Sequence, residues 1–82
     1  MKNDTKQMRL SEVTPQSACR VVDAADGHAE IQSRLYTLGL YPGVQVRVLR
    51  LAPLGDPMQI KVGSALLSIR RQEADLIQVD ML

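Results

Sequence analysis

Apolar and polar residues alternate over several short stretches of this chain, and the alternation predicts a mainly β structure. Every second residue is apolar, and the residues between are mostly polar, over 44–48, 58–62, 65–69 and 77–81. This period of two is typical of half-buried strands. Residues 18–24 form a further stretch rich in small and β-branched residues, although its pattern does not identify the buried face. We therefore expect about five short strands.

One segment has the period of a helix instead. Three apolar residues lie three and four positions apart and share one helical face: Ile31, Leu35 and Leu38. They predict a single inserted α-helix over about residues 28–38. Asp26 or Gly27 is the expected N-cap. Gly39 directly follows the last apolar residue, as a C-terminal capping glycine does.

Glycine and proline predict where the strands turn. Pro42 and Gly43 occupy the two central positions of a type II turn. Gly63 opens a two-residue hairpin loop. The alternation changes phase at Val48 and Leu49, which predicts a β-bulge or a strong bend.

These elements predict a single domain. Residues 1–8 are polar and aperiodic, and we interpret them as a flexible lead-in to a domain spanning 9–82. One helical turn fits the charged residues 71–75. Short alternating strands joined by tight turns are typical of a small barrel or sandwich.

Composition narrows the function classes. The 82 residues include no Trp, no Phe and only two Tyr, so the core must be aliphatic. Binders that stack bases and modules that recognise PxxP segments both rely on aromatic surfaces. The net charge of +1 gives no overall field toward nucleic acid or an anionic membrane. One cysteine, no apolar leader and no long apolar run indicate a reduced, cytoplasmic protein.

The sequence shows no catalytic motif, and we expect a protein that is not an enzyme. Five potential metal ligands lie in one stretch: Cys19, Asp23, Asp26, His28 and Glu30. No two of them have a recurrent ligand spacing. We expect a buried Cys19 and a solvated His28, and no cofactor, with weak divalent metal binding by these two residues as the alternative.

The arginines are a second group of candidates. Five of them could form a basic patch: Arg34, Arg47, Arg50, Arg70 and Arg71. Because the overall charge is balanced, we favour solvated faces on which they pair with nearby carboxylates: Glu30, Asp56, Glu73 and Asp75.

Three runs of residues resemble the signatures of one protein family. Residues 34–43 read RLYTLGLYPG, residues 50–57 read RLAPLGDP, and residues 66–74 read LLSIRRQEA before IQV at 77–79. Together they resemble the ferrous iron transport protein A (FeoA) family over roughly residues 9–80. The middle run is the most specific.

The resemblance implies a fold and a role. It implies an SH3-like small β-barrel of about five strands with one inserted helix. It also implies a small cytosolic accessory or regulatory protein of bacterial ferrous iron uptake. The implied partner is the membrane ferrous iron permease with its GTPase domain, at the inner face of the cytoplasmic membrane. The turn at residues 14–17 departs from the family pattern.

The best candidate for a partner surface is the rigid loop after the second predicted strand. Its residues, with the preceding arginine, are Arg50, Pro53, Leu54, Gly55, Asp56 and Pro57. Leu54 is either an apolar anchor held at the tip or a lid folded back onto the core. The apolar C-terminal residues 79–82 are a candidate for weak self-association.

Two other functions remain as alternatives. The first is a metal-binding sensor or carrier for iron or zinc that uses Cys19 and His28. The second is a small-barrel nucleic-acid-binding protein, although the balanced charge and missing aromatics favour neither nucleic acid nor membrane insertion.

Overall fold

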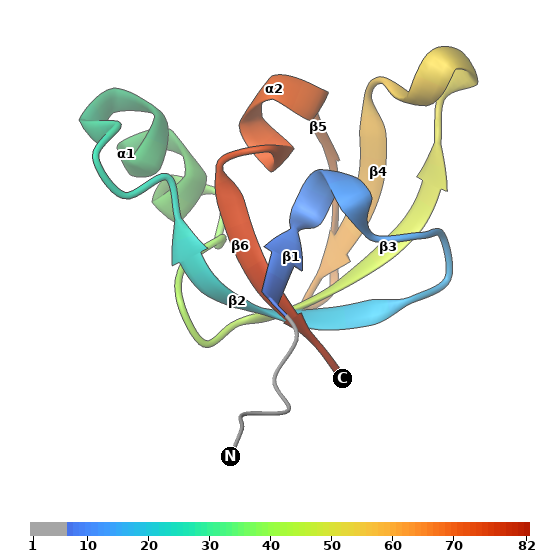
Figure 1. Ribbon diagram of the computed structural model, residues 1–82, viewed down its shortest axis with the longest axis horizontal. Helices are drawn as coiled ribbons and strands as arrows, with labels where there is room; N and C mark the ends of the chain where they lie inside the picture. The colour runs from blue at the N-terminus through green and yellow to red at the C-terminus, as the bar shows by residue number, and fades with distance from the viewer. Residues whose placement is uncertain (1–6) are drawn as a thin grey trace.

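The computed structural model describes residues 7–82, which form one curled antiparallel sheet with its helices gathered toward one end of the strands (Figure 1). The strands are β1 (Gln7–Arg9), β2 (Ala18–Ala24), β3 (Gln45–Leu51), β4 (Met58–Val62), β5 (Ala65–Ile69) and β6 (Ile77–Met81). The helices are α1 (Ala29–Thr37) and α2 (Arg71–Ala74), with 3₁₀ turns η1 (Leu10–Glu12) and η2 (Pro53–Gly55). The mainly β prediction with one inserted helix is confirmed.

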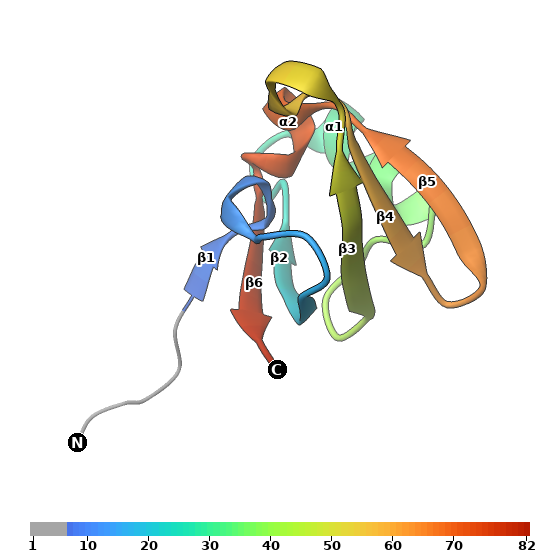
Figure 2. The ribbon, with the colours of Figure 1, turned by 90° about the vertical axis from the view of Figure 1, so that its right-hand side faces the viewer.

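The sheet contains six strands, one more than the pattern predicted. Their order is β1-β6-β2-β3-β4-β5, and Figure 2 shows them side by side in this order. The additional strand is β1, in which Gln7 pairs with Asp80 of β6. The predicted lead-in of residues 1–8 therefore ends too late, and the rest of it, residues 1–6, lies outside the described residues. A three-residue strand is too short to show alternation, and only Met8 packs against the core.

One face of the sheet forms the core. The buried strand residues are Cys19, Val21, Ala24, Val46, Val48, Met58, Ile60, Val62, Ile69, Ile77 and Val79. They are aliphatic or sulfur-containing, as the composition required. Because the side chains of a strand alternate between faces, the residues between these positions face outward.

Two bulges explain where the sequence pattern loses its phase. The register between β3 and β4 shifts between Val48 and Arg50, as predicted. A second shift occurs in β2 between Val21 and Asp23, so Val22 is the extra residue there. A bulge restarts the alternation on the same face, and this is why residues 18–24 did not reveal their buried side.

The helix end follows the prediction, whereas its start does not. The amide of Leu40 donates to the carbonyl of Leu35 at 2.9 Å, and Gly39 donates to Tyr36 at 3.0 Å, the two bonds of a Schellman motif. Leu35 and Leu40 are both fully buried beneath it. The N-cap is His28, without a side-chain cap bond, and not Asp26 or Gly27.

The predicted turns are present. Gly43 has φ of +97°, and Val44 donates to the carbonyl of Tyr41 at 3.2 Å, as in a type II turn. Gly63 has φ of +60° and links paired Val62 and Ala65. Within residues 7–82, no helix has the length and apolarity needed to cross a bilayer.

Candidate partner-binding site

The loop between β3 and β4 carries the most exposed large apolar side chain among the described residues. The whole side chain of Leu54 is exposed, with a relative accessibility of 100%, at the tip of η2. Of the two roles considered for Leu54, the structure therefore shows the exposed position and not the lid. Exposed leucines occur on most protein surfaces, so exposure alone does not indicate a binding site. The backbone conformation of Leu54 is the more informative feature.

The backbone holds Leu54 in an unusual conformation. Leu54 has φ of 71° and ψ of 7°, close to the third residue of a type II turn, where Gly or Asn is usual. The amide of Gly55 donates to the carbonyl of Ala52 at 2.8 Å, which closes this turn. A left-handed conformation is unfavourable for a leucine, and here no burial of the side chain offsets it.

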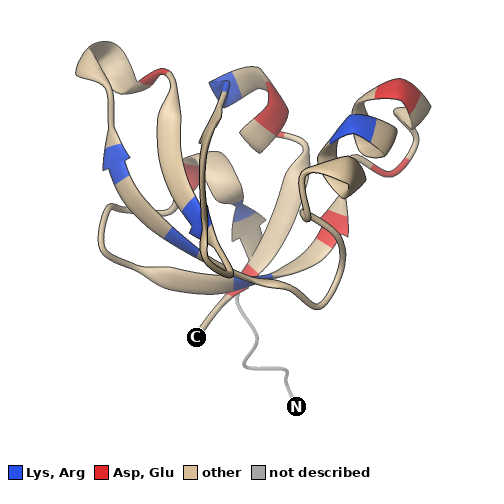
Figure 3. Cartoon of the chain, turned by 180° about the vertical axis from the view of Figure 1, so that it is seen from behind, with Lys and Arg blue, Asp and Glu red and all other residues tan. Residues whose placement is uncertain are grey.

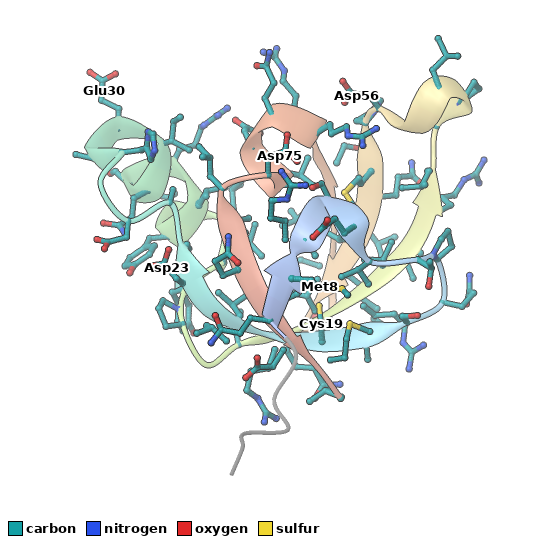
Figure 4. All side chains as sticks on the ribbon, in the orientation of Figure 1. Met8, Cys19, Asp23, Glu30, Asp56 and Asp75 are labelled. Carbon is teal, nitrogen blue, oxygen red and sulfur yellow. The ribbon has the colours of Figure 1, made fainter. Side chains whose placement is uncertain are left out.

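The loop is fastened at its base. The amide of Ala52 donates to the carbonyl of Pro57 at 3.0 Å, across the width of the loop. Asp56 Oδ1 accepts a hydrogen bond from the backbone amide of Arg71, the first residue of α2, at 3.0 Å. Figure 4 shows Asp56 in the space between α2 and η2. The loop is therefore ordered in advance of any partner, which lowers the entropy lost on binding.

An ion pair joins the helix that holds this loop to the inserted helix. Arg34 of α1 pairs with Glu73 of α2. Glu73 is nearly buried, with only 8% of its surface exposed. Glu73 Oε1 also accepts from the backbone amide of Arg70 at 3.4 Å. The sequence analysis expected the arginines to pair with a set of carboxylates that includes Glu73, but it could not match Arg34 to Glu73, because 39 positions separate them along the chain.

The other predicted carboxylate partners do not pair with arginine side chains. Asp56 binds a backbone amide, and Asp75 accepts from the hydroxyl of Ser11. The ion pairs found within residues 7–82 are Arg34–Glu73 and Arg9–Glu12, the latter at 3.2 Å. The predicted pairing is therefore wrong for the other four candidate arginines within residues 7–82, although all four are exposed as expected: Arg47, Arg50, Arg70 and Arg71.

Arg50 lies at the foot of the loop and not at its tip. The register places it opposite Gln59 of β4, beyond the bulge. The bulge turns Arg50 to the outer face, where it is exposed. Arg50 thus belongs to a different surface from Leu54, although β3 connects the two.

The residues considered as metal ligands are not gathered into a site. Cys19 is fully buried in the core, and burial raises the pKa of its thiol to about 11. His28 is exposed at the start of α1. Among residues 7–82, no group of three His, Cys, Asp or Glu side chains could hold a metal ion. The geometry therefore offers no support for the metal-carrier alternative.

Comparison with known proteins places these features in one family. The family model of the FeoA domain matches residues 8–81. The solution structure of FeoA from Chlorobium tepidum is 41% identical with a TM-score of 0.81, covering 92% of this chain and 70% of that one. Stenotrophomonas maltophilia FeoA is 34% identical with a TM-score of 0.77, and 89% of each chain is covered.

Two descriptions of relatives bear on function. The Stenotrophomonas protein was crystallised with zinc and is described as a prokaryotic SH3 domain protein and a candidate ferrous iron transport activating factor. A curated relative from Porphyromonas gingivalis is a fusion of Fe(2+) transport protein A with the Fe(2+) transporter FeoB. It is 29% identical over 75 residues, which are 92% of this chain but only 9% of the fusion.

Proposed function

Because this chain belongs to the FeoA domain family, we propose that it is a non-enzymatic accessory protein of bacterial ferrous iron uptake that binds the membrane permease. The surface that makes the contact is the loop of residues 53–57, with Leu54 as its anchor. The protein acts in the cytoplasm and is recruited to the inner face of the cytoplasmic membrane through this contact.

The relative from Porphyromonas gingivalis supports the choice of partner. In that protein an FeoA segment and the transporter FeoB belong to one polypeptide. Fusion raises the effective concentration of one module near the other, which is useful when the two modules act together. In a separate chain, a binding surface must supply the same proximity.

The exposed and constrained position of Leu54 is the observation that carries the proposal. A fully exposed leucine in a left-handed conformation is locally unfavourable for a free protein. Burial of one leucine side chain at an interface is worth about 1.5–3 kcal/mol. Since the two hydrogen bonds at the base already order the loop, little of this gain is lost to ordering.

Co-purification with the detergent-solubilised permease tests the proposal. We compare the wild type with Leu54→Asn, which removes the anchor and suits the backbone at this position. Leu82→Asn is the matched control, since Leu82 is another exposed leucine and lies at the opposite end of the molecule (Figure 1). We expect Leu54→Asn to lose binding and Leu82→Asn to retain it. Equal binding by the folded Leu54→Asn variant would remove the loop from the interface.

A further inference from the structure

A strip of positive charge runs along the outer face of the two strands that carry the loop. Arg47 and Arg50 lie on β3 and Lys61 on β4, and all three are exposed. Neither strand contains an Asp or Glu. Figure 3 accordingly shows blue segments on both strands and no red one.

The register places two of these charges directly opposite one another. Arg47 of β3 pairs with Lys61 of β4, and their buried neighbours Val46, Val48, Ile60 and Val62 fix both side chains on the outer face. The Cβ atoms of such a pair are about 5 Å apart, and like charges on directly opposite residues are destabilising. The pair is thus unfavourable in the free protein.

Among residues 7–82, no carboxylate forms an ion pair with the three basic side chains of this strip, Arg47, Arg50 and Lys61. Arg47 Nη1 donates to the carbonyl oxygen of Gln16 at 3.0 Å, a neutral acceptor that leaves the positive charge of the guanidinium uncompensated. Asp80 of β6 lies opposite Arg20 of β2, and β6 is two strands away from β3.

The strip includes a hollow and an apolar neighbour. Gln45, Arg47, Lys61 and Gly63 line an open depression of about 350 Å³. The space beside Gly63 is open, since a Cβ at that position would meet nothing within 4 Å. Leu66 of β5 lies opposite Lys61 in the register and is 70% exposed.

We propose that the outer face of β3 and β4 binds an acidic segment of the permease, as a second contact surface beside the Leu54 loop. This rests on the proposed function and names the chemistry of the partner. Two observations select an acidic protein segment: the uncompensated charge at Arg47, Arg50 and Lys61, and the covalent continuity of both strands with the loop. Charge complementarity of this kind fixes the orientation of a partner and accelerates its association.

Other anionic partners fit this face less well. A membrane surface requires clusters of about four to eight basic residues, and this strip has three. Single-stranded nucleic acid requires aromatic stacking, and neither strand has an aromatic residue. Vesicles and nucleic acid therefore enter the test as outcomes that would overturn the assignment.

The test measures affinity for the solubilised permease at low and at high salt. The variant Arg47→Gln/Lys61→Gln removes two charges from the strip. The control Ala29→Glu/Ser33→Glu changes the net charge by the same amount at two exposed positions of α1. We expect the first variant to bind about tenfold more weakly at low salt, with a reduced salt dependence, and the control to resemble the wild type. Equal loss in both variants would show a non-specific charge effect and overturn the proposal.

The design separates this proposal from the proposed function. If Leu54→Asn loses permease binding while Arg47→Gln/Lys61→Gln binds as the wild type does, the strip is not part of the interface and the proposed function stands. If the wild type does not bind the permease at all, the proposed function fails. A fluorescent oligoglutamate peptide then tests the face by itself: salt-sensitive binding lost in the double variant supports an acidic ligand, and no binding refutes it. Preferential binding of anionic lipid vesicles or single-stranded DNA over the peptide would also refute it.

Discussion

At the scale of single residues, Leu54 combines two features that do not stabilise the free protein. Its backbone is left-handed, and its side chain is fully exposed. Such residues are retained when the surrounding structure fixes them, and they are concentrated at functional sites. Here the fixing structure is the pair of hydrogen bonds from Gly55 to Ala52 and from Ala52 to Pro57.

We predict that Leu54→Asn stabilises the protein while it weakens partner binding. Asn tolerates the left-handed region, and no buried contact is lost, so the free energy of unfolding should rise by up to about 1 kcal/mol. Chemical denaturation measures the change. Leu54→Ala is the control, because its Cβ keeps the backbone strain and its stability should match the wild type. Destabilisation by Leu54→Asn would mean that the leucine packs against the protein after all.

Cys19 gives a second prediction at this scale, on reactivity. Its side chain is fully buried, and burial raises the pKa of the thiol from 9.0 to about 11. The thiolate is the reactive species, so the folded protein should resist a thiol reagent at neutral pH. We expect labelling only at the rate of unfolding, and rapid labelling in denaturant. Fast labelling of the native protein would contradict the buried position.

The same pKa shift links Cys19 to alkaline stability. The folded state holds the thiol proton more tightly than the unfolded state between the two pKa values. The contribution of Cys19 is therefore complete below pH 9.0 and is lost as the pH rises toward about 11. In Cys19→Ala this part of the alkaline decline should disappear from denaturation curves measured across that range.

At the scale of elements, the short helix α2 organises the neighbourhood of the loop. Asp56 accepts from its first amide, and Arg34 of α1 pairs with its Glu73. Four residues cannot form a stable helix by themselves, since nucleation is unfavourable. The hydrogen bond with Asp56 and the ion pair with Arg34 therefore stabilise α2 from outside the helix.

We predict that Asp56→Ala frees the loop from α2. It leaves the amide of Arg71 without its acceptor, and loss of such a cap-like bond costs about 1 kcal/mol of stability. Hydrogen exchange at Arg71 should accelerate, as measured by NMR. Asp56→Asn keeps an acceptor oxygen and is the control with near-normal protection. If Asp56→Ala exchanges as slowly as the wild type, the loop is held by other contacts.

The ion pair between α1 and α2 gives a prediction that a double-mutant cycle can measure. Arg34→Ala leaves the nearly buried carboxylate of Glu73 without its partner, and we expect a loss of about 1–2 kcal/mol, between the values for exposed and buried pairs. Glu73→Gln removes the charge. The double variant should lose less than the sum of the two single variants. Strict additivity would show that the two side chains do not interact in solution.

At the scale of the whole molecule, the fold is SH3-like but lacks the surface that SH3 domains use for proline-rich peptides. The part of the chain that the structure describes has two exposed aromatic rings, Tyr36 and Tyr41. They pack edge to face, with 6.3 Å between the ring centroids. Both belong to α1 and the turn after it, and neither lies on a strand of the sheet. A shared fold therefore does not bring the shared ligand with it.

We predict that PxxP peptides do not bind this protein. Recognition of a polyproline II segment needs a groove lined by several aromatic rings, and one tyrosine pair does not build one. Fluorescence titration of a labelled PxxP peptide measures the affinity, with a peptide-binding SH3 domain as positive control. Saturable binding that is lost in Tyr36→Ala or Tyr41→Ala would contradict the prediction.

The sequence by itself determined the features that depend on neighbouring residues. The alternation predicted β3 to β6, Gly39 predicted the Schellman cap, and Gly63 predicted the hairpin. The phase change at Val48 and Leu49 predicted the bulge. In each case the physical cause is local: side chains alternate along a strand, and glycine adopts a left-handed backbone without strain.

Only the tertiary structure decided the features that join distant residues. β1 exists because β6 offers it an edge, and no three-residue pattern reveals that. The partners of Arg34 and Asp56 lie 39 and 15 positions away. The exposure of Leu54 and the opposition of Arg47 and Lys61 follow from the course of the loop and the register of two strands. Sequence determines which residues can bind a partner, whereas the fold determines which of them are left unpaired at the surface, because pairing and exposure depend on contacts across the sheet.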